Sequence, residues 1–209
     1  MKGGVFRVIR YLPVVLLALG LGCAGAKAKI PVESNSVDPG TSVARGEARF
    51  QLLGSPIALG KPLPPVNLVD AMTLKDVDLS QEKGSVLFLS IVPSLDTAVC
   101  EAQTHVLGEE GEKVSKEIRR ITISRDTPFA QKRFAKEAKL TRLQYLSDYK
   151  EGGFGKATGL LMDKTMLLAR SVVLVDKKGM IRYIQVVPDI TRLPDMEKAF
   201  QKSAELDKE

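Results

Sequence analysis

The stretch SVLFLSIVPSLDTAVCEAQTH, residues 85–105, joins two different patterns and decides the fold. Residues 85–92 form a continuous apolar run with several β-branched side chains, which is typical of a strand buried on both faces. Pro93 ends this strand, and a helix is expected from about Val99. Cys100 then lies in the first helical turn, where backbone N–H groups are unpaired and the helix dipole is positive. Because a thiolate is stabilised there, the sequence predicts a nucleophilic cysteine at the start of a helix.

The segments that follow alternate between strand and helix patterns. The clearest local signal is at residues 126–140, where Thr127 is expected to cap a helix and Pro128 to occupy its first position. The order strand, helix, strand, helix, strand, hairpin, helix predicts an α/β protein with a thioredoxin-like fold, a central mixed sheet flanked by helices. The other expected elements are strands at 118–124 and 142–147, a glycine-bounded loop with room for a helical turn at 152–161, two strands within 169–187 joined by a turn at 176–179, and an amphipathic helix within 192–206.

The N-terminal part of the domain is expected to contain short strands. Residues 48–60 have the pattern of a β-hairpin with its turn at 54–55, and residues 64–80 suggest one or two further strands. Residues 24–44 are small and polar and include two prolines, a composition typical of a flexible tether. The folded domain is therefore expected over residues 45–209, with an additional N-terminal β-hairpin.

The first 23 residues have the features of an export signal. A basic start is followed by an apolar stretch at residues 11–21 and then by small residues. The apolar stretch is about half as long as a membrane-spanning helix. We therefore expect an exported bacterial protein that works in the periplasm.

The end of this signal leaves two processing outcomes open. The stretch GLGC, residues 20–23, resembles a bacterial lipobox, in which Cys23 is lipidated and becomes the new N-terminus, although Gly20 replaces the usual large aliphatic residue. The lipid would anchor the protein to a membrane. The alternative is ordinary cleavage after residue 26 or residue 28, which discards Cys23. In both outcomes the domain keeps one thiol, whereas structural cysteines of oxidising compartments normally come in pairs.

The composition argues against several classes of function. The chain is 44% hydrophobic and 27% charged, so it can bury a core. The net charge is +6, but Lys2, Arg7 and Arg10 contribute to it at the N-terminus, and the remaining charges form runs of mixed sign. With no basic stripe and no tryptophan, nucleic acid is not an expected partner. A single histidine, His105, beside a lone thiol gives no support to a metal site, and no cofactor is expected.

A family resemblance becomes specific at residues 93–100, PSLDTAVC. They fit the peroxiredoxin signature of a proline, three residues, a threonine, two residues and the peroxidatic cysteine. The context is similar to the thiol peroxidase branch of that family, of the atypical two-cysteine type, and the resemblance covers residues 45–205. Its other motifs are PIALGKPLPPVNLVD (56–70), DTPFAQKRF (126–134), GFGKATG (153–159) and LLARSVVLVDKKG (167–179), in which Arg170 has the family's active-site position.

The resemblance implies a thiol peroxidase in a thioredoxin-like fold. The Cys100 thiolate would attack one oxygen of hydrogen peroxide or an organic hydroperoxide, giving a sulfenic acid and releasing water or an alcohol. Thr97 and the Cys100 backbone N–H would orient the peroxide. Arg170 would stabilise the thiolate and the departing oxygen, and Pro93 would shield the pocket from solvent. Homodimers are usual in this branch, so a homodimer is expected.

The chain departs from this branch at one position. Relatives usually carry a second, resolving cysteine directly after the phenylalanine of the motif PFAQKRF, and here that residue is Ala135. An intramolecular disulfide is therefore not expected in the mature domain. The sulfenic acid must be reduced by an external thiol, a thioredoxin-like reductant or a cysteine of another protein, because it is otherwise oxidised further to sulfinic acid.

The same residues also allow simpler interpretations. Cys100 could be a small buried hydrophobic residue, and Thr97 could cap the following helix. Arg170 could pair with a buried acid such as Glu101 or Asp96. On the level of function, the alternatives are a non-enzymatic peroxide sensor and a degenerate scaffold, either of which would form mixed disulfides with a partner.

Overall fold

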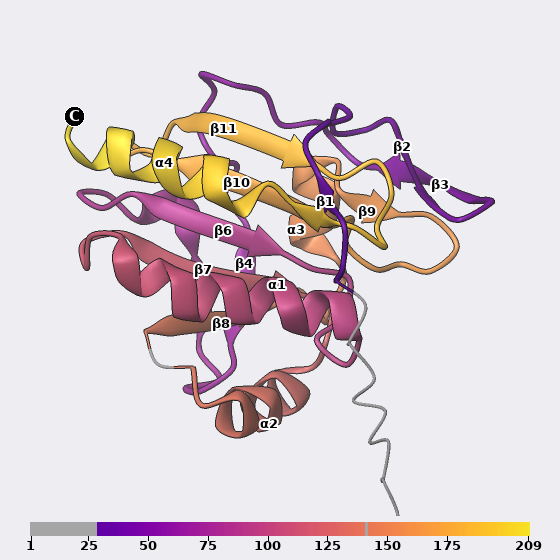
Figure 1. Ribbon diagram of the computed structural model, residues 1–209, viewed down its shortest axis with the longest axis horizontal. Helices are drawn as coiled ribbons and strands as arrows, with labels where there is room; N and C mark the ends of the chain where they lie inside the picture. The colour runs from indigo at the N-terminus through magenta and orange to yellow at the C-terminus, as the bar shows by residue number, and fades with distance from the viewer. Residues whose placement is uncertain (1–28, 141) are drawn as a thin grey trace, which may run out of the picture.

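A seven-stranded mixed sheet forms the centre of the protein in the computed structural model, which describes residues 29–140 and 142–209 (Figure 1). The strand order is β11-β10-β6-β7-β8-β4-β5. Strands β6, β7 and β8 are parallel to one another, whereas the strands on either side of them pair antiparallel. The bounds are β4 (Asn67–Asp70), β5 (Asp76–Asp78), β6 (Leu87–Ile91), β7 (Arg119–Ser124), β8 (Leu143–Ser147), β10 (Ser171–Val175) and β11 (Ile181–Val186).

Helices cover both faces of this sheet, so the α/β architecture predicted from the sequence is present. All five residues of β6 are buried, because its two faces pack into two different hydrophobic clusters. Helices α1 (Ala98–Glu109) and α4 (Met196–Asp207) pack on the face that carries Phe88, and α3 (Gly153–Thr158) packs on the face that carries Leu87 and Leu89. Helix α2 (Pro128–Ala138) lies beside β8. Two short 3-10 turns, Leu79–Gln81 and Glu110–Lys113, complete the helical segments of the described chain.

Local sequence signals place several element ends. Thr127 is the N-cap of α2: its hydroxyl oxygen accepts a hydrogen bond from the Ala130 backbone N–H at 3.3 Å, and Pro128 opens the helix. The predicted turn between β10 and β11 is also confirmed. Asp176 accepts hydrogen bonds there from two backbone N–H groups, and Gly179 adopts a φ of 85°, which glycine tolerates best. These predictions held because the signals lie within a few residues of the structure they determine.

The predicted hairpin over residues 48–60 is wrong. The hairpin instead joins β2 (Ser42–Arg45) to β3 (Ala48–Leu53), and the second edge of β3 pairs with β9 (Leu161–Met162). Gly54 does not form the hairpin turn. Its φ is 105°, and a side chain there would collide with the backbone of Lys156, so glycine allows the chain to pass close to α3.

The tether expected over residues 24–44 is also corrected where the structure describes it. Strand β1 (Val32–Glu33) pairs in parallel with β12 (Leu193–Pro194), and Val43 is completely buried. Residues 29–44 are therefore part of the domain, which begins before residue 45. The export signal and the lipobox with Cys23 lie outside the described residues. None of the described helices is long and apolar enough to span a membrane.

Candidate active site

Cys100 is the third residue of α1 and is completely buried. Strand β6 ends at Ile91, and the loop that follows turns the chain back, so that α1 begins beside the ends of the parallel strands. The thiol is free, and its residue packs in a small cluster with the apolar side chains Val92 and Leu95 and with Tyr145. The sequence prediction placed the helix start within one residue, so the thiol lies in the first turn as expected.

Arg170 contacts Cys100 although the two are 70 positions apart in the chain. Its Nη2 donates a hydrogen bond to the Cys100 Sγ at 3.2 Å. Its Nη1 donates to the Gln103 Oε1 at 2.7 Å, and its Nε donates to the Ile190 backbone carbonyl at 2.9 Å. Gln103 is held in turn, because its amide donates to the Ser90 hydroxyl at 2.8 Å. Three hydrogen bonds therefore fix the guanidinium beside the sulfur.

The Arg170 side chain is only 2% exposed, and its hydrogen-bond partners explain how the fold tolerates this buried cation. In the described part of the chain they are a sulfur, an amide oxygen and a backbone carbonyl, and none of them is a carboxylate. A buried charge without a counter-ion is costly, and this cost falls when an anion forms next to it. The guanidinium therefore faces the Cys100 sulfur rather than a carboxylate. The alternative of a buried acid as partner is wrong, because Asp96 lies 3.9 Å from Arg133 and Glu101 lies 4.0 Å from His105.

Thr97 occupies the N-cap position of α1 without capping it through its side chain. Its hydroxyl donates to the Ser94 backbone carbonyl at 3.1 Å, so the oxygen lone pairs remain available to accept. The alternative in which this hydroxyl caps the helix is therefore not supported, although Thr97 does occupy the N-cap position. Its orientation leaves an acceptor at the pocket, next to the first turn of the helix.

A pocket of about 240 Å³ opens beside these residues. Pro93, Thr97 and Arg170, three of the residues predicted to form the site, line it together. The fourth, Cys100, is not part of this lining, but its sulfur accepts a hydrogen bond from Arg170, which is. The pocket thus provides room for a small substrate beside three of the predicted site residues, while the thiol itself is buried.

Asp126 fixes the loop that precedes Cys100, a role that sequence reasoning missed. Its carboxylate accepts hydrogen bonds from the Ser94 hydroxyl, the Leu95 backbone N–H and the Ser124 hydroxyl, each at 2.7 Å. The loop is therefore tied to the end of β7. The only sequence signal for this role is that an acidic residue begins the motif DTPFAQKRF. The sequence does not show which backbone N–H group the carboxylate accepts from.

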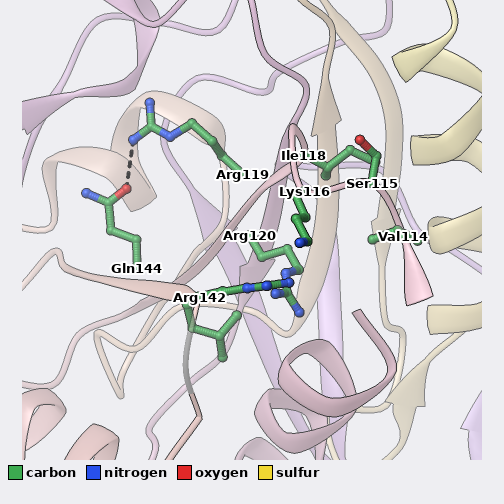
Figure 2. Close-up of a pocket in the computed structure, with 9 residues that line it drawn as sticks. Val114, Ser115, Lys116, Ile118, Arg119, Arg120, Arg142 and Gln144 are labelled. Carbon is green, nitrogen blue, oxygen red and sulfur yellow. Dashed lines mark hydrogen bonds between the residues drawn. The ribbon is translucent and has the colours of Figure 1, made fainter. Parts of the chain in front are cut away.

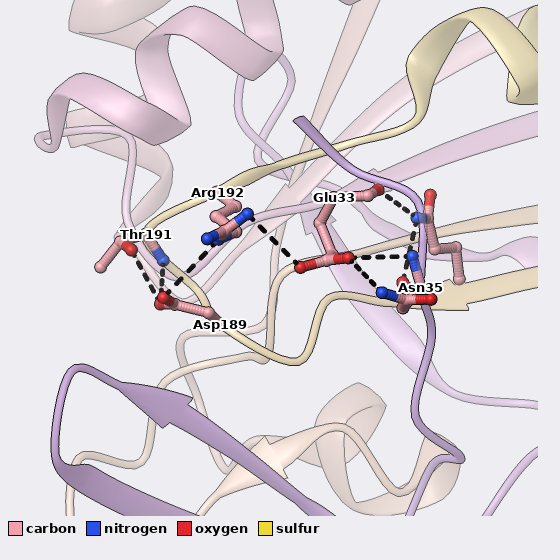
Figure 3. Close-up of polar contacts among 6 residues, drawn as sticks. Glu33, Asn35, Asp189, Thr191 and Arg192 are labelled. Carbon is pink, nitrogen blue, oxygen red and sulfur yellow. Dashed lines mark hydrogen bonds and ion pairs between the residues drawn. The ribbon is translucent and has the colours of Figure 1, made fainter. Parts of the chain in front are cut away.

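The N-terminal segment fixes the loop that carries Ile190 (Figure 3). Arg192 lies 3.9 Å from Glu33 on β1 and 4.0 Å from Asp189, and Asp189 accepts hydrogen bonds from both the backbone N–H and the hydroxyl of Thr191. Because the Ile190 carbonyl accepts from the Arg170 Nε, this network positions the guanidinium indirectly. Residues assigned to a tether by sequence thus support the site.

Two neighbours of Cys100 limit the chemistry available to it. Ala135, where the sequence resemblance led us to expect a resolving cysteine, packs against the cluster that contains Cys100. It offers no thiol. Burial raises the pKa of Tyr145 to about 12, so its hydroxyl stays protonated at neutral pH and does not serve as a base.

A second pocket, of about 430 Å³, lies near the other end of α1 (Figure 2). Arg120 lines it and donates hydrogen bonds to the carbonyls of Leu107 and Gly108 at 3.1 and 2.9 Å. Arg119 donates to the Gln144 side chain at 2.8 Å and is paired with Glu82. Arg120 therefore ties the C-terminal half of α1 to β7, and the pocket shares no residue with the one that Pro93, Thr97 and Arg170 line.

The geometry defines a class of protein: a thiol-based redox protein with one buried, guanidinium-supported cysteine on an α/β sheet. The family model for Redoxin matches residues 58–200. The chain is 38% identical over 150 residues to the thiol peroxidase of Halalkalibacterium halodurans, an alignment that covers 72% of this chain and 89% of the relative. It is 34% identical over 155 residues to the thiol peroxidase of Bacillus subtilis, covering 74% and 92%.

A solved structure shows the same likeness. The peroxiredoxin-like protein from Aquifex aeolicus superposes with a TM-score of 0.73 at 30% identity, covering 79% of this chain and 96% of that one. The chain therefore belongs to the Redoxin family, in its thiol peroxidase branch. The predicted thioredoxin-like fold is confirmed.

Proposed function

We propose that this thiol-dependent peroxidase reduces hydroperoxides through Cys100 alone, with an external thiol completing the cycle. The observation that carries the proposal is the 3.2 Å contact between the Arg170 guanidinium and the Cys100 Sγ in a buried site. A fixed cation beside a sulfur at a helix start stabilises both the attacking thiolate and the charge that develops on the departing oxygen.

The first half-reaction follows from the placement of these groups. The Cys100 thiolate attacks the terminal oxygen of the hydroperoxide, an S–O bond forms and the O–O bond breaks. The sulfur loses two electrons and becomes a sulfenic acid, while the other oxygen leaves as hydroxide or alkoxide and takes a proton to give water or an alcohol. Thr97 accepts a hydrogen bond from the bound peroxide, Arg170 stabilises the leaving oxygen, and Pro93 covers the pocket.

The second half-reaction requires a reductant of the thiol class. A thiolate attacks the sulfenic sulfur, an S–S bond forms while the S–O bond breaks, and the hydroxide that leaves takes a proton to give water. A second thiol reduces the resulting mixed disulfide. Ala135 excludes the internal route used by two-cysteine relatives. A variant with Ala135→Cys restores that pattern. After peroxide treatment it is expected to lose both thiols to an internal disulfide, whereas the wild-type protein forms none.

The function is tested by rapid mixing of the reduced protein with equimolar peroxide. We expect the reaction to consume one thiol per protein, faster than free cysteine reacts, and Cys100→Ser to abolish it. A rate constant no higher than that of free cysteine would overturn the proposal. Turnover with a small thiol or with a thioredoxin-like protein then identifies the class of reductant.

A non-enzymatic peroxide sensor is the second candidate, and the complete burial of Cys100 favours it. A sensor would form a defined mixed disulfide with one partner and would not turn over with any reductant. Multiple turnovers with an external thiol exclude both the sensor and a degenerate scaffold.

The cellular setting and the assembly are proposals of the same kind. An N-terminal export signal supports a periplasmic protein, and the GLGC stretch supports a lipid anchor at Cys23. Mass spectrometry of the mature N-terminus tests the anchor: an unmodified peptide that begins at residue 27 or 29 overturns it. The resemblance to the thiol peroxidase branch supports a homodimer, and Phe129 on α2, which is 70% exposed, is the residue we expect the interface to cover. Analytical ultracentrifugation of the wild-type protein and of Phe129→Ser tests the dimer.

A further inference from the structure

We propose that the active-site pocket selects organic hydroperoxides that carry a carboxylate, and that Arg45 binds this carboxylate at the rim. The inference rests on the proposed peroxidase function and adds the chemical class of the substrate. It is carried by the lining of the pocket, which combines an apolar wall with one exposed cation that the reaction itself does not use.

The wall of the pocket fits the carbon body of a substrate rather than hydrogen peroxide alone. It is formed mainly by apolar side chains from four separate segments: Phe50, Val99, Met162, Leu167 and Ile190. Hydrogen peroxide has no apolar surface to bury, so these side chains would contribute nothing to its binding. With a volume of about 240 Å³, the pocket accepts a compact organic group next to the reacting oxygens.

The pairing of the N-terminal hairpin directs Arg45 toward this pocket. In the register of β2 and β3, Arg45 lies opposite Ala48, and Val43 lies opposite Phe50. Because side chains alternate along a strand, Arg45 shares a face with Val43 and Phe50, both of which are buried. Arg49 lies on the opposite face of the same hairpin and does not line the pocket.

The charge of Arg45 is not neutralised within the described part of the chain. No ion pair of Arg45 is found there. Asp189, which bridges to the neighbouring Ala44 through the backbone, directs its carboxylate to Thr191 and Arg192. The second cation of the lining, Arg170, is committed to the sulfur and its two oxygen partners. Arg45 therefore remains to recognise an anion.

A carboxylate is the anionic group that suits this place. A guanidinium binds a carboxylate through two parallel hydrogen bonds, and the rim leaves the ion pair partly hydrated, so that little desolvation is required. The apolar wall holds the carbon body between the two arginines. One end of the substrate then reacts at the sulfur while the other end is fixed by Arg45.

The test compares two substrates that differ only in charge. Cumene hydroperoxide with a para-carboxylate and its methyl ester are each mixed with the reduced full-length protein, and single-turnover rate constants are measured at low and high salt. The variants are Arg45→Gln and the matched control Arg49→Gln, which removes an exposed cation from the other face of the hairpin. Binding of the two corresponding alcohols, measured by titration calorimetry, repeats the comparison without chemistry.

We expect the wild-type protein to prefer the acid over the ester by about three- to fivefold, the size typical of an ion pair at an exposed rim, and to lose this preference at high salt. Arg45→Gln should remove the preference, and Arg49→Gln should keep it. Equal rates for acid and ester in the wild-type protein overturn the inference, as does an equal loss in both variants. If no hydroperoxide oxidises Cys100, the proposed function fails, and the alcohol titrations still decide whether Arg45 selects the carboxylate.

Discussion

Replacing Arg170 by methionine tests the site at its most specific contact. Methionine fills much of the same volume but removes all three hydrogen bonds. The lost donor to the Cys100 Sγ acts where charge develops, and removal of such a donor usually lowers a rate constant about 100- to 1000-fold. We therefore expect the second-order rate constant with hydrogen peroxide to fall by about that factor.

The same substitution also weakens the fold, because Gln103 Oε1 and the Ile190 carbonyl lose their donor. Each buried acceptor left unsatisfied costs about 1–3 kcal/mol, so the free energy of unfolding should fall by about 2–6 kcal/mol. Urea unfolding measures this loss. The rate constants are then compared at a temperature where the variant is still folded.

Arg120→Met is the matched control for this experiment. Arg120 is also a buried arginine, 5% exposed, and donates to two carbonyls near the other end of α1. Its loss should destabilise the protein to a similar degree and leave the peroxide rate constant of the folded protein unchanged. The reasoning is refuted if folded Arg170→Met reacts within about tenfold of the wild-type protein, or if Arg120→Met slows the reaction equally.

Three further predictions follow from individual contacts. Tyr145→Phe should leave the free energy of unfolding unchanged or raise it by up to about 1 kcal/mol, because the buried Tyr145 hydroxyl has no hydrogen-bond partner among the described residues; a clear loss in urea unfolding would contradict this. Asp126→Asn should slow peroxide reduction about tenfold with little change in fold, because the neutral amide holds the loop before the thiol less firmly; an unchanged stopped-flow rate would show that the loop is positioned by other contacts. Burial opposes ionisation of Asp176, but hydrogen bonds from the Met180 backbone N–H and from Arg182 outweigh it and hold the pKa of this carboxyl below its ordinary value. The ionised Asp176 carboxyl therefore stabilises the folded protein fully above its unfolded-state pKa, and this contribution is lost as the pH falls through the lower folded-state pKa. Unfolding experiments should find Asp176→Asn destabilising at neutral pH and progressively less so below about pH 4.

The parts of the fold that sequence predicted correctly depend on short-range physics. The apolar run at residues 85–92, the cap at Thr127 and the turn at 176–179 each contain their own determinant within a few residues. The N-terminal hairpin failed for the opposite reason. Glycine is common in turns, but Gly54 adopts its positive φ because the chain passes close to α3 there, and α3 is more than 95 residues away in the chain.

The residues of the site likewise fall into those that could be predicted from the sequence and those that only the packing of the fold brings together. The helix start at Cys100 follows from the local pattern, and Arg170 was placed by resemblance to a family. Gln103, Asp126 and the Ile190 carbonyl could not be predicted, because their partners come together only through the packing of the sheet and its helices. An amide, an acid and a backbone carbonyl carry no sequence signal of the atom they will bind.

The most direct test of the central claim is the intact mass of the reduced protein after one equivalent of hydrogen peroxide, with no reductant present. The account predicts the gain of a single oxygen atom on Cys100, no internal disulfide, and a return to the starting mass when a thiol is added. A protein whose Cys100 stays reduced while peroxide persists, or whose added oxygen lies on methionine instead, contradicts it.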